Sequence, residues 1–134
     1  MASKKNRGSY KLGVIREQTQ QLILRAAEIE FASHGYGGTT IQGIAVRTGV
    51  PKSNIHYYFR NKLHLYGTVL ETTLQIWDEV FNELSPEQEP SHILSRYIDA
   101  KMEFSRTNPR ASRLFTNEII RGAPYLSAYF QQDY

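Results

Sequence analysis

The stretch Thr39–Lys62, TTIQGIAVRTGVPKSNIHYYFRNK, predicts two short helices joined by a tight turn. Thr40 is a suitable N-cap for the first helix. The residues of one face of that helix then follow at helical spacing: Ile41, Ile44, Ala45 and Thr48. Gly49 ends the helix, because glycine tolerates the left-handed backbone of a helix C-terminus, and Pro51 suits the first turn of the next helix.

The second helix is predicted over residues 52–59, with Ile55 and Phe59 facing inward one turn apart. The side chains left for its other faces are hydrogen-bonding groups and a cation: Lys52, Ser53, Asn54, His56, Tyr57 and Tyr58. Amide, hydroxyl and basic groups at the start of a short helix are what base edges and phosphates in a DNA major groove require. We therefore interpret this helix as a recognition helix.

The composition is that of an ordinary globular chain. Its 134 residues, 40% hydrophobic and 22% charged, allow one buried core and one domain, or one and a part. The absence of cysteine excludes disulfides, thiolate nucleophiles and cysteine metal sites. No apolar run approaches the ~20 residues of a membrane span, and the basic N-terminus lacks the apolar core of a signal peptide. We therefore expect a cytoplasmic protein.

The net charge of +3 is unevenly distributed along the chain. Residues 1–62 hold ten Lys or Arg against three Glu, a local charge of +7, whereas residues 63–134 carry −4. A polyanion is attracted to the first half and not to the second. Nucleic acid is the expected partner, since the segment lacks the long amphipathic helix with a basic face that a membrane surface would require.

Residues 1–13 are rich in Ser, Gly, Asn, Lys and Arg, and we expect a mobile basic arm there. Two interpretations stay open. The arm is either a solvated tail or a segment whose cations lie along phosphates or enter a minor groove: Lys4, Lys5, Arg7 and Lys11.

Helical periodicity continues on both sides of the paired helices. A helix is predicted from about residue 15 to 33, ended by His34-Gly35, with residues 35–38 as a glycine-rich turn. Asn61 is predicted to cap a long helix with a nearly unbroken apolar stripe: Leu63, Tyr66, Leu70, Leu74, Trp77, Phe81 and Leu84.

Two further helices are predicted after the break at residues 85–90. Ser91 caps the first, which runs to about Thr107 and has these candidate buried positions: Leu94, Tyr97, Ile98, Met102 and Phe104. Asn108-Pro109 opens the second, which Gly122 and Pro124 close, with these apolar residues: Ala111, Leu114, Phe115, Ile119 and Ile120. Another helix begins near Tyr125. No strand is predicted, so the fold class is all-α.

The second half contains candidates for a small-molecule pocket. Its apolar walls would be Trp77, Phe81, Tyr97 and Phe115, with Asn117 and Glu118 as polar anchors. Aromatic residues at helical spacing are, however, more often core residues. The arginines of this half either bind an acidic ligand or, more commonly, form a solvated face: Arg106, Arg110, Arg113 and Arg121.

Catalysis is disfavoured. The four histidines, at positions 34, 56, 64 and 92, have no metal-binding spacing, and neither a Ser-His-Asp arrangement nor paired carboxylates are suggested. We expect no metal and no cofactor. A helical protein–protein interaction module is the competing interpretation, and it explains the apolar stripes but not the charge of +7.

Having reached these residues by spacing and capping, we note that GTTIQGIAVRTGVPKSNIHYYFRNKLHLY closely resembles the DNA-binding segment of the TetR family of bacterial transcription regulators. With the preceding AAEIEFASHGYGGTT, the resemblance covers residues 16–74. The stretch NPRASRLFTNEIIRGAP, residues 108–124, is similar to the ligand domain of the pyrimidine-utilisation repressor subgroup. Such ligand domains can hold different molecules on one scaffold.

The resemblance implies a helix-turn-helix domain over residues 14–62 and the start of a helical effector-binding and dimerisation domain over residues 63–134. It also implies a homodimer on a palindromic operator, released by a small-molecule effector. The DNA-contacting positions it implies are Thr40, Gln42, Lys52, Ser53, Asn54, Tyr57, Tyr58 and Lys62. Asn54 is suited to adenine, and Lys52 to guanine or phosphate.

Three departures from the family pattern are visible. His56 stands where many relatives carry tyrosine or leucine, and it is either a reader of base or phosphate or an exposed polar residue. Gly43 places a helix-weakening residue, costing ~1 kcal/mol relative to alanine, inside the first paired helix. Family members also continue well past residue 134, so we expect this chain to correspond to the front part of one.

Overall fold

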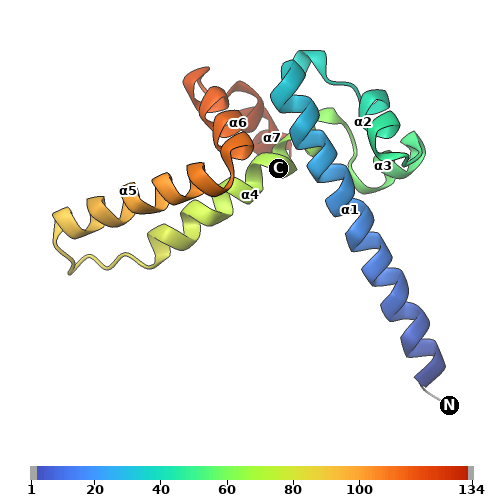
Figure 1. The fold of residues 1–134 in the computed structure, drawn as a ribbon, viewed down its shortest axis with the longest axis horizontal. Coiled ribbons are helices and arrows are strands. Elements are labelled where there is room, and N and C mark those ends of the chain that lie inside the picture. Colours follow the sequence, from blue (N-terminus) through green and yellow to red (C-terminus); the bar gives the residue numbers. More distant parts are fainter. Residues whose placement is uncertain (1–2, 133–134) are drawn as a thin grey trace.

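The computed structural model of the chain describes residues 3–132, which form seven α-helices and no strand (Figure 1). The all-α prediction is therefore confirmed. The helices are α1 (Ser3–Gly38), α2 (Ile41–Thr48), α3 (Lys52–Tyr58), α4 (Lys62–Asn82), α5 (Pro90–Thr107), α6 (Pro109–Ile120) and α7 (Pro124–Gln132). None of these helices, over the described residues, has the length and apolar content to cross a membrane.

The helix pair α2–α3 forms as its capping residues predict. The Thr40 hydroxyl accepts a hydrogen bond from the Gly43 amide at 2.9 Å, and Gly49 ends α2 with a left-handed φ of 72°. The Gly49 amide donates to the carbonyl of Ala45 at 2.9 Å. A positive φ is disfavoured for any residue with a Cβ, so glycine is required for this turn.

The pair is held by a core that the apolar spacing also predicted. Ile44 of α2 and Ile55 of α3 are fully buried against Ile23, Ala27 and Phe31 of α1. Phe59, just after α3, joins the same cluster. These contacts leave the opposite sides of α2 and α3 exposed.

Helix α1 is longer than predicted. The expected break is present, since Gly35 has non-helical dihedral angles (φ 71°, ψ 176°), but one more helical turn follows it to Gly38. At the other end, residues 3–13 are helical where a mobile arm was expected, and residues 1 and 2 lie outside the described part. Once a helix is nucleated by its packed turns, each added residue gains a backbone hydrogen bond at little further cost.

Helix α4 connects the two halves of the molecule. The predicted cap is confirmed, because the Asn61 side chain accepts from the His64 amide at 2.8 Å. The first turns of α4 are buried against α1, α6 and α7, but the predicted stripe does not stay buried to its end, since Phe81 is 53% exposed. Figure 1 shows the reason: the distal half of α4 lies beside α5 alone, away from the other helices.

Helix α5 differs most from the prediction. Its N-cap is Glu89 with Pro90 in the first turn, so Ser91 lies inside the helix and does not cap it. Phe104 is buried and Tyr97 is half-buried, but the other predicted core residues are exposed: Leu94, Ile98 and Met102. Among the described residues no helix packs on that face of α5, so its apolar periodicity does not lead to burial.

Helix α6 begins at Pro109 as predicted, and Leu114 is buried within it. Ala111 and Phe115 are half-buried, whereas Ile119 and Ile120 are exposed. The side of α6 that does pack carries Leu114 and Glu118, one turn apart. Gly122, with φ 87°, then reverses the chain into α7.

Candidate nucleic-acid interface

Helix α3, the predicted recognition helix, presents a polar face whose orientation is set by its buried residues. Ile55 is fully buried and Phe59 nearly so. The residues between and before them are exposed: Lys52, Ser53, Asn54, His56 and Tyr57. One short helix therefore displays an ammonium group, a hydroxyl, an amide, an imidazole and a phenol on its accessible side. These are the groups that meet phosphates and base edges.

Two aromatic residues end this helix and behave differently. The Tyr57 side chain is 72% exposed, and its ring lies 5.1 Å from that of Tyr58 in an edge-to-face arrangement. Tyr58 is half-buried and packs against the core. Tyr57 is therefore accessible to a partner, whereas Tyr58 packs between the Tyr57 ring and the core.

Helix α2 packs against α3, and its first residues offer two more predicted contacts, Thr40 and Gln42, which are both exposed. The Thr40 oxygen already accepts a hydrogen bond from the Gly43 amide, so its hydroxyl proton remains available for an acceptor such as a phosphate oxygen. The structure also explains Gly43. A Cβ at this position would lie 3.2 Å from the Thr40 Oγ1 and would crowd the cap.

Lys62 has a structural role that the sequence did not reveal. Its Nζ donates to the carbonyl oxygens of Tyr36 at 2.9 Å and Thr39 at 3.1 Å, and it lies 4.5 Å from the centre of the Tyr36 ring. This ammonium group ties the end of α1 to the start of α4. Its predicted role in gripping the DNA backbone stays a prediction, and the structure gives the cation other partners.

A second cation of the front half is also engaged within the protein. Arg47 of α2 donates from Nε to Glu30 of α1 at 2.7 Å, and His34 lies 3.4 Å from the other oxygen of that carboxylate. The charge of +7 therefore overstates what faces a polyanion. Sequence alone could not find this pair, because its partners are 17 residues apart.

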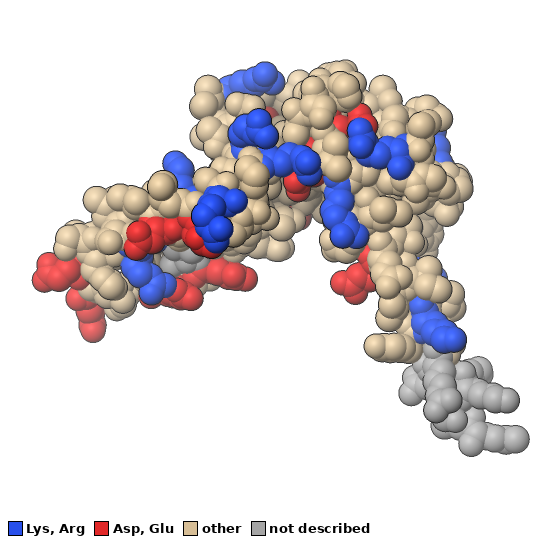
Figure 2. All heavy atoms as spheres, in the orientation of Figure 1, with Lys and Arg blue, Asp and Glu red and all other residues tan. Residues whose placement is uncertain are grey.

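Acidic residues concentrate elsewhere. Figure 2 shows most of the acidic residues of this face over the α4–α5 pair, with a few others near α1. The exposed carboxylates there include Glu79, Glu83, Glu87 and Glu89. This placement agrees with the predicted division of charge between the two halves.

The four predicted pocket aromatics come together in one hollow of about 360 Å³ between α4, α5 and α6. We call it the aromatic hollow. The Trp77 and Tyr97 rings are 5.4 Å apart, the Phe81 and Tyr97 rings are 6.1 Å apart, and Phe115 completes the wall. Polar groups in its lining are Thr73, Lys101, Ser112 and Thr116.

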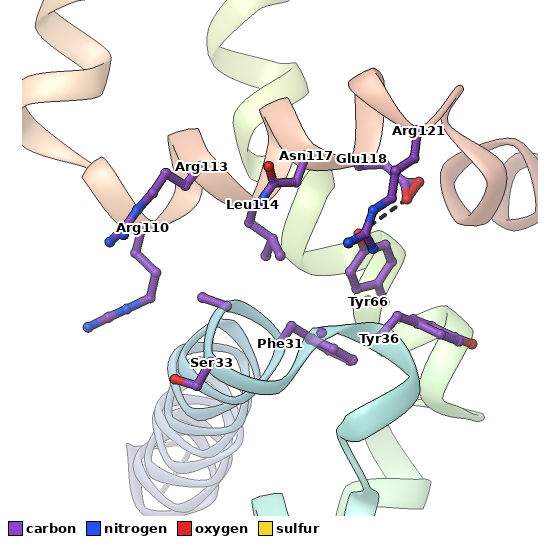
Figure 3. Close-up of a pocket in the computed structure, with 12 residues that line it drawn as sticks. Phe31, Ser33, Tyr36, Tyr66, Arg110, Arg113, Leu114, Asn117, Glu118 and Arg121 are labelled. Atoms are coloured by element: carbon purple, nitrogen blue, oxygen red, sulfur yellow. Dashed lines mark hydrogen bonds between the residues drawn. The ribbon is translucent and has the colours of Figure 1, made fainter.

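The predicted polar anchors do not reach that hollow. Asn117 and Glu118 line a different one of about 500 Å³, between the end of α1 and the opposite side of α6 (Figure 3), which we call the junction hollow. Asn117 follows Phe115 by two residues, which is about 200° around the helix. Glu118 points with Leu114, one turn earlier, toward α4 and α7. The prediction therefore combined residues from two different faces.

Glu118 is committed to the protein itself. It is 2% exposed, and its two oxygens accept from the Tyr66 hydroxyl at 3.3 Å and from the Tyr125 and Leu126 amides at 3.2 Å each. The amides belong to the first turn of α7, where a negative charge is favourable. Burial raises the pKa of Tyr66, and the neighbouring Glu118 carboxylate raises it further.

Comparison with known proteins matches both halves of the chain. Residues 23–69 match the family model described as bacterial regulatory proteins of the tetR family, and residues 70–134 match the C-terminal region of YcdC-like proteins. The transcriptional regulator RutR of Escherichia coli K12 is 40% identical over 107 residues, which cover 80% of this chain and 50% of that protein. The transcriptional repressor BepR of Brucella suis is 29% identical over 101 residues, covering 74% and 48%.

Solved structures agree with the sequence matches. A mutant of HlyIIR, a hemolysin II transcriptional regulator, superposes with a TM-score of 0.66 at 30% identity, covering 87% of this chain and 70% of that one. The chain spans about half the length of RutR and BepR.

Proposed function

Because this chain belongs to the TetR family of bacterial transcription regulators, we propose that it is a DNA-binding transcriptional repressor that acts as a homodimer on a palindromic operator. The observation that supports this best is the exposed polar face of α3, held in place by the capped helix α2. In this proposal two copies place their recognition helices in successive major grooves, ~34 Å apart. No catalytic step is part of it.

The roles of the side chains follow from their chemistry and position. Asn54 reads a base edge, and Lys52 contacts guanine or a phosphate. Thr40 and Tyr57 position the protein through phosphates, because both offer a hydroxyl proton from an exposed site. The remaining proposed contacts are Gln42, Ser53, His56, Tyr58 and Lys62.

The effector is proposed to bind in the aromatic hollow. A planar ring can pack against Trp77 and Tyr97, while Ser112 and Thr116 offer hydroxyl groups to its polar edge. A pyrimidine or related nitrogen compound is the first candidate, because residues 108–124 resemble the pyrimidine-utilisation subgroup. This choice rests on resemblance, and the hollow is consistent with it in size and lining.

Helix α4 is the proposed connection between effector and DNA. Thr73, Leu74 and Trp77 line the aromatic hollow, and Lys62 at the start of the same helix is hydrogen-bonded to the end of α1. An effector that binds one tilt of α4 more tightly shifts the population toward that tilt. The two recognition helices then no longer match the spacing of the grooves.

The first experiment is selection of this chain against a randomised duplex library, followed by fluorescence anisotropy at low salt on the enriched sequence. We expect an inverted repeat to be enriched. K52A and Y57F should weaken binding to it, whereas R106A, which removes one cation from the exposed face of α5, should not. Unchanged affinity in both K52A and Y57F would refute the proposed interface.

The effector is tested by thermodynamic reciprocity. Effector and operator must weaken each other's binding by the same factor. A metabolite panel screened by thermal shift supplies the candidates. A compound that binds but leaves operator affinity unchanged is not the effector.

A further inference from the structure

The junction hollow has the character of a site for an anion. Its α6 wall carries Arg110, Arg113 and Asn117 at steps of three and four along one helix face, and Arg121 follows as the C-cap residue of α6. Figure 3 shows Arg110 and Arg113 at one side of the hollow and Arg121 at the opposite side. Each guanidinium presents several N–H donors in a rigid fork that suits carboxylate and phosphate oxygens.

These arginines are largely without internal partners. Arg110 lies 3.9 Å from Glu28 of α1, at the outer limit of an ion pair. Among the described side chains, no carboxylate forms an ion pair with Arg113 or Arg121. Glu118, the carboxylate in the lining, turns its oxygens to Tyr66 and to the start of α7. The hollow therefore keeps an excess of positive charge.

Arg106 serves as a comparison, because it is an arginine outside the junction hollow. It lies on α5, where it binds the carboxylate of Glu103 at 2.7 and 3.1 Å in full exposure, and it lines neither hollow. That pairing raises the pKa of Arg106 and lowers that of Glu103. All four arginines that the sequence grouped together are exposed, but they differ in their surroundings. Arg106 is paired with Glu103 on α5, whereas Arg110, Arg113 and Arg121 line the junction hollow.

We propose that the junction hollow binds a small multivalent oxyanion, carrying carboxylate or phosphate groups, through Arg113 and Arg121. Arg110 and the Asn117 amide add further donors, and Ser33 of α1 faces them from the other side. The separation of the arginines to two sides of the hollow favours an anion with more than one acidic group. Because α1 and α6 form opposite walls, the bound anion links the helix that supports the DNA-reading pair to the effector half.

Binding of the anion does not depend on the proposed repressor function; only an effect of the anion on operator affinity would rest on it. The test is NMR titration of the ¹⁵N-labelled chain with pyrophosphate and, separately, with citrate at constant ionic strength, because each of these anions carries more than one acidic group. We expect saturable shifts at the amides of Ala32, Ser33, Gly35 and Asn117, and none at Thr73 or Ile119 in the aromatic hollow. The stronger of the two anions identifies the acidic group that the site prefers.

Three matched variants, R113Q, R121Q and R106Q, each remove one positive charge. R113Q and R121Q should weaken binding of the preferred anion by about tenfold or more, because each loses a charge-assisted hydrogen bond. R106Q should change the dissociation constant by less than about twofold, since a distant exposed charge is screened. Circular dichroism checks the fold of each variant. If a variant unfolds, the site is tested by the location of the chemical-shift changes in the wild-type chain.

Several outcomes would overturn the proposal. The first is that neither anion causes saturable chemical-shift changes, and the second is that such changes are confined to residues outside the junction hollow. The third is that R106Q loses as much affinity for the anion as R113Q and R121Q do, which would indicate diffuse charge attraction. The failure of this site is distinguishable from failure of the repressor proposal. Anisotropy with duplex DNA would still separate K52A from R106A when no anion binds.

Discussion

Replacement of Glu118 tests how α7 is held against the rest of the molecule. In E118A the Tyr66 hydroxyl and the Tyr125 and Leu126 amides lose their acceptor. The three bonds are long, 3.2–3.3 Å, so we assign each the modest net value of about 1 kcal/mol and expect a loss of about 3 kcal/mol in the free energy of unfolding. E118Q keeps one carbonyl acceptor and should lose about half of that.

The measurement is urea denaturation followed by far-UV circular dichroism, with Y66F and E103Q alongside. Y66F removes one of the three bonds and should cost about 1 kcal/mol. The Glu103 side chain is 61% exposed and pairs with Arg106 at the surface, so E103Q should lower the midpoint much less than Y66F does. Amide hydrogen exchange should accelerate in residues 125–129 of E118A. A wild-type midpoint for E118A, or a loss in Y66F as large as that in E118A, would refute this account of α7.

Three further outcomes follow from single contacts. T40A should lower the free energy of unfolding by about 1 kcal/mol, because the Gly43 amide loses its capping oxygen, and thermal denaturation measures this. G67A should lower the free energy of unfolding by about 1–3 kcal/mol despite alanine's higher helix propensity, since a Cβ there would lie 2.2 Å from the Tyr129 ring. A urea midpoint that rises in G67A would contradict the packing of α7 on α4. The pKa of Tyr66 is raised in the folded chain, so its phenol contributes stability that is complete below pH of about 10 and declines as the pH rises further. Between pH 9 and 11 the wild type should therefore lose more stability than Y66F, and equal losses would contradict the assignment.

Helix α7 packs on the first turns of α4, close to the end of α3. The Tyr129 ring packs on Gly67 and stacks at 6.1 Å with His64, whose Nδ1 accepts from the Arg60 amide at 3.1 Å beside the end of α3. Glu118 secures the other end of α7 to α6 and α4. Packed and hydrogen-bonded groups therefore connect α6 through α7 to the start of α4.

The fold of the α2–α3 pair could be predicted almost completely from sequence, because its determinants are local. Thr40, Gly49 and Asn61 each act on backbone groups within a few residues of themselves, and Ile44 and Ile55 are fixed by helical spacing. The same reasoning was wrong for Leu94, Ile98 and Met102. Periodicity identifies an apolar face, but only the arrangement of neighbouring helices decides whether that face is covered.

The sequence by itself determined the helix boundaries around residues 39–62, the all-α class and the set of aromatic residues that line the aromatic hollow, since capping and spacing act over one or two helical turns. The tertiary structure decided the partners of Lys62, Arg47 and Glu118 and the division of the pocket candidates between two hollows. Those contacts join residues 7 to 52 positions apart in the chain, and no local rule specifies which helix faces meet.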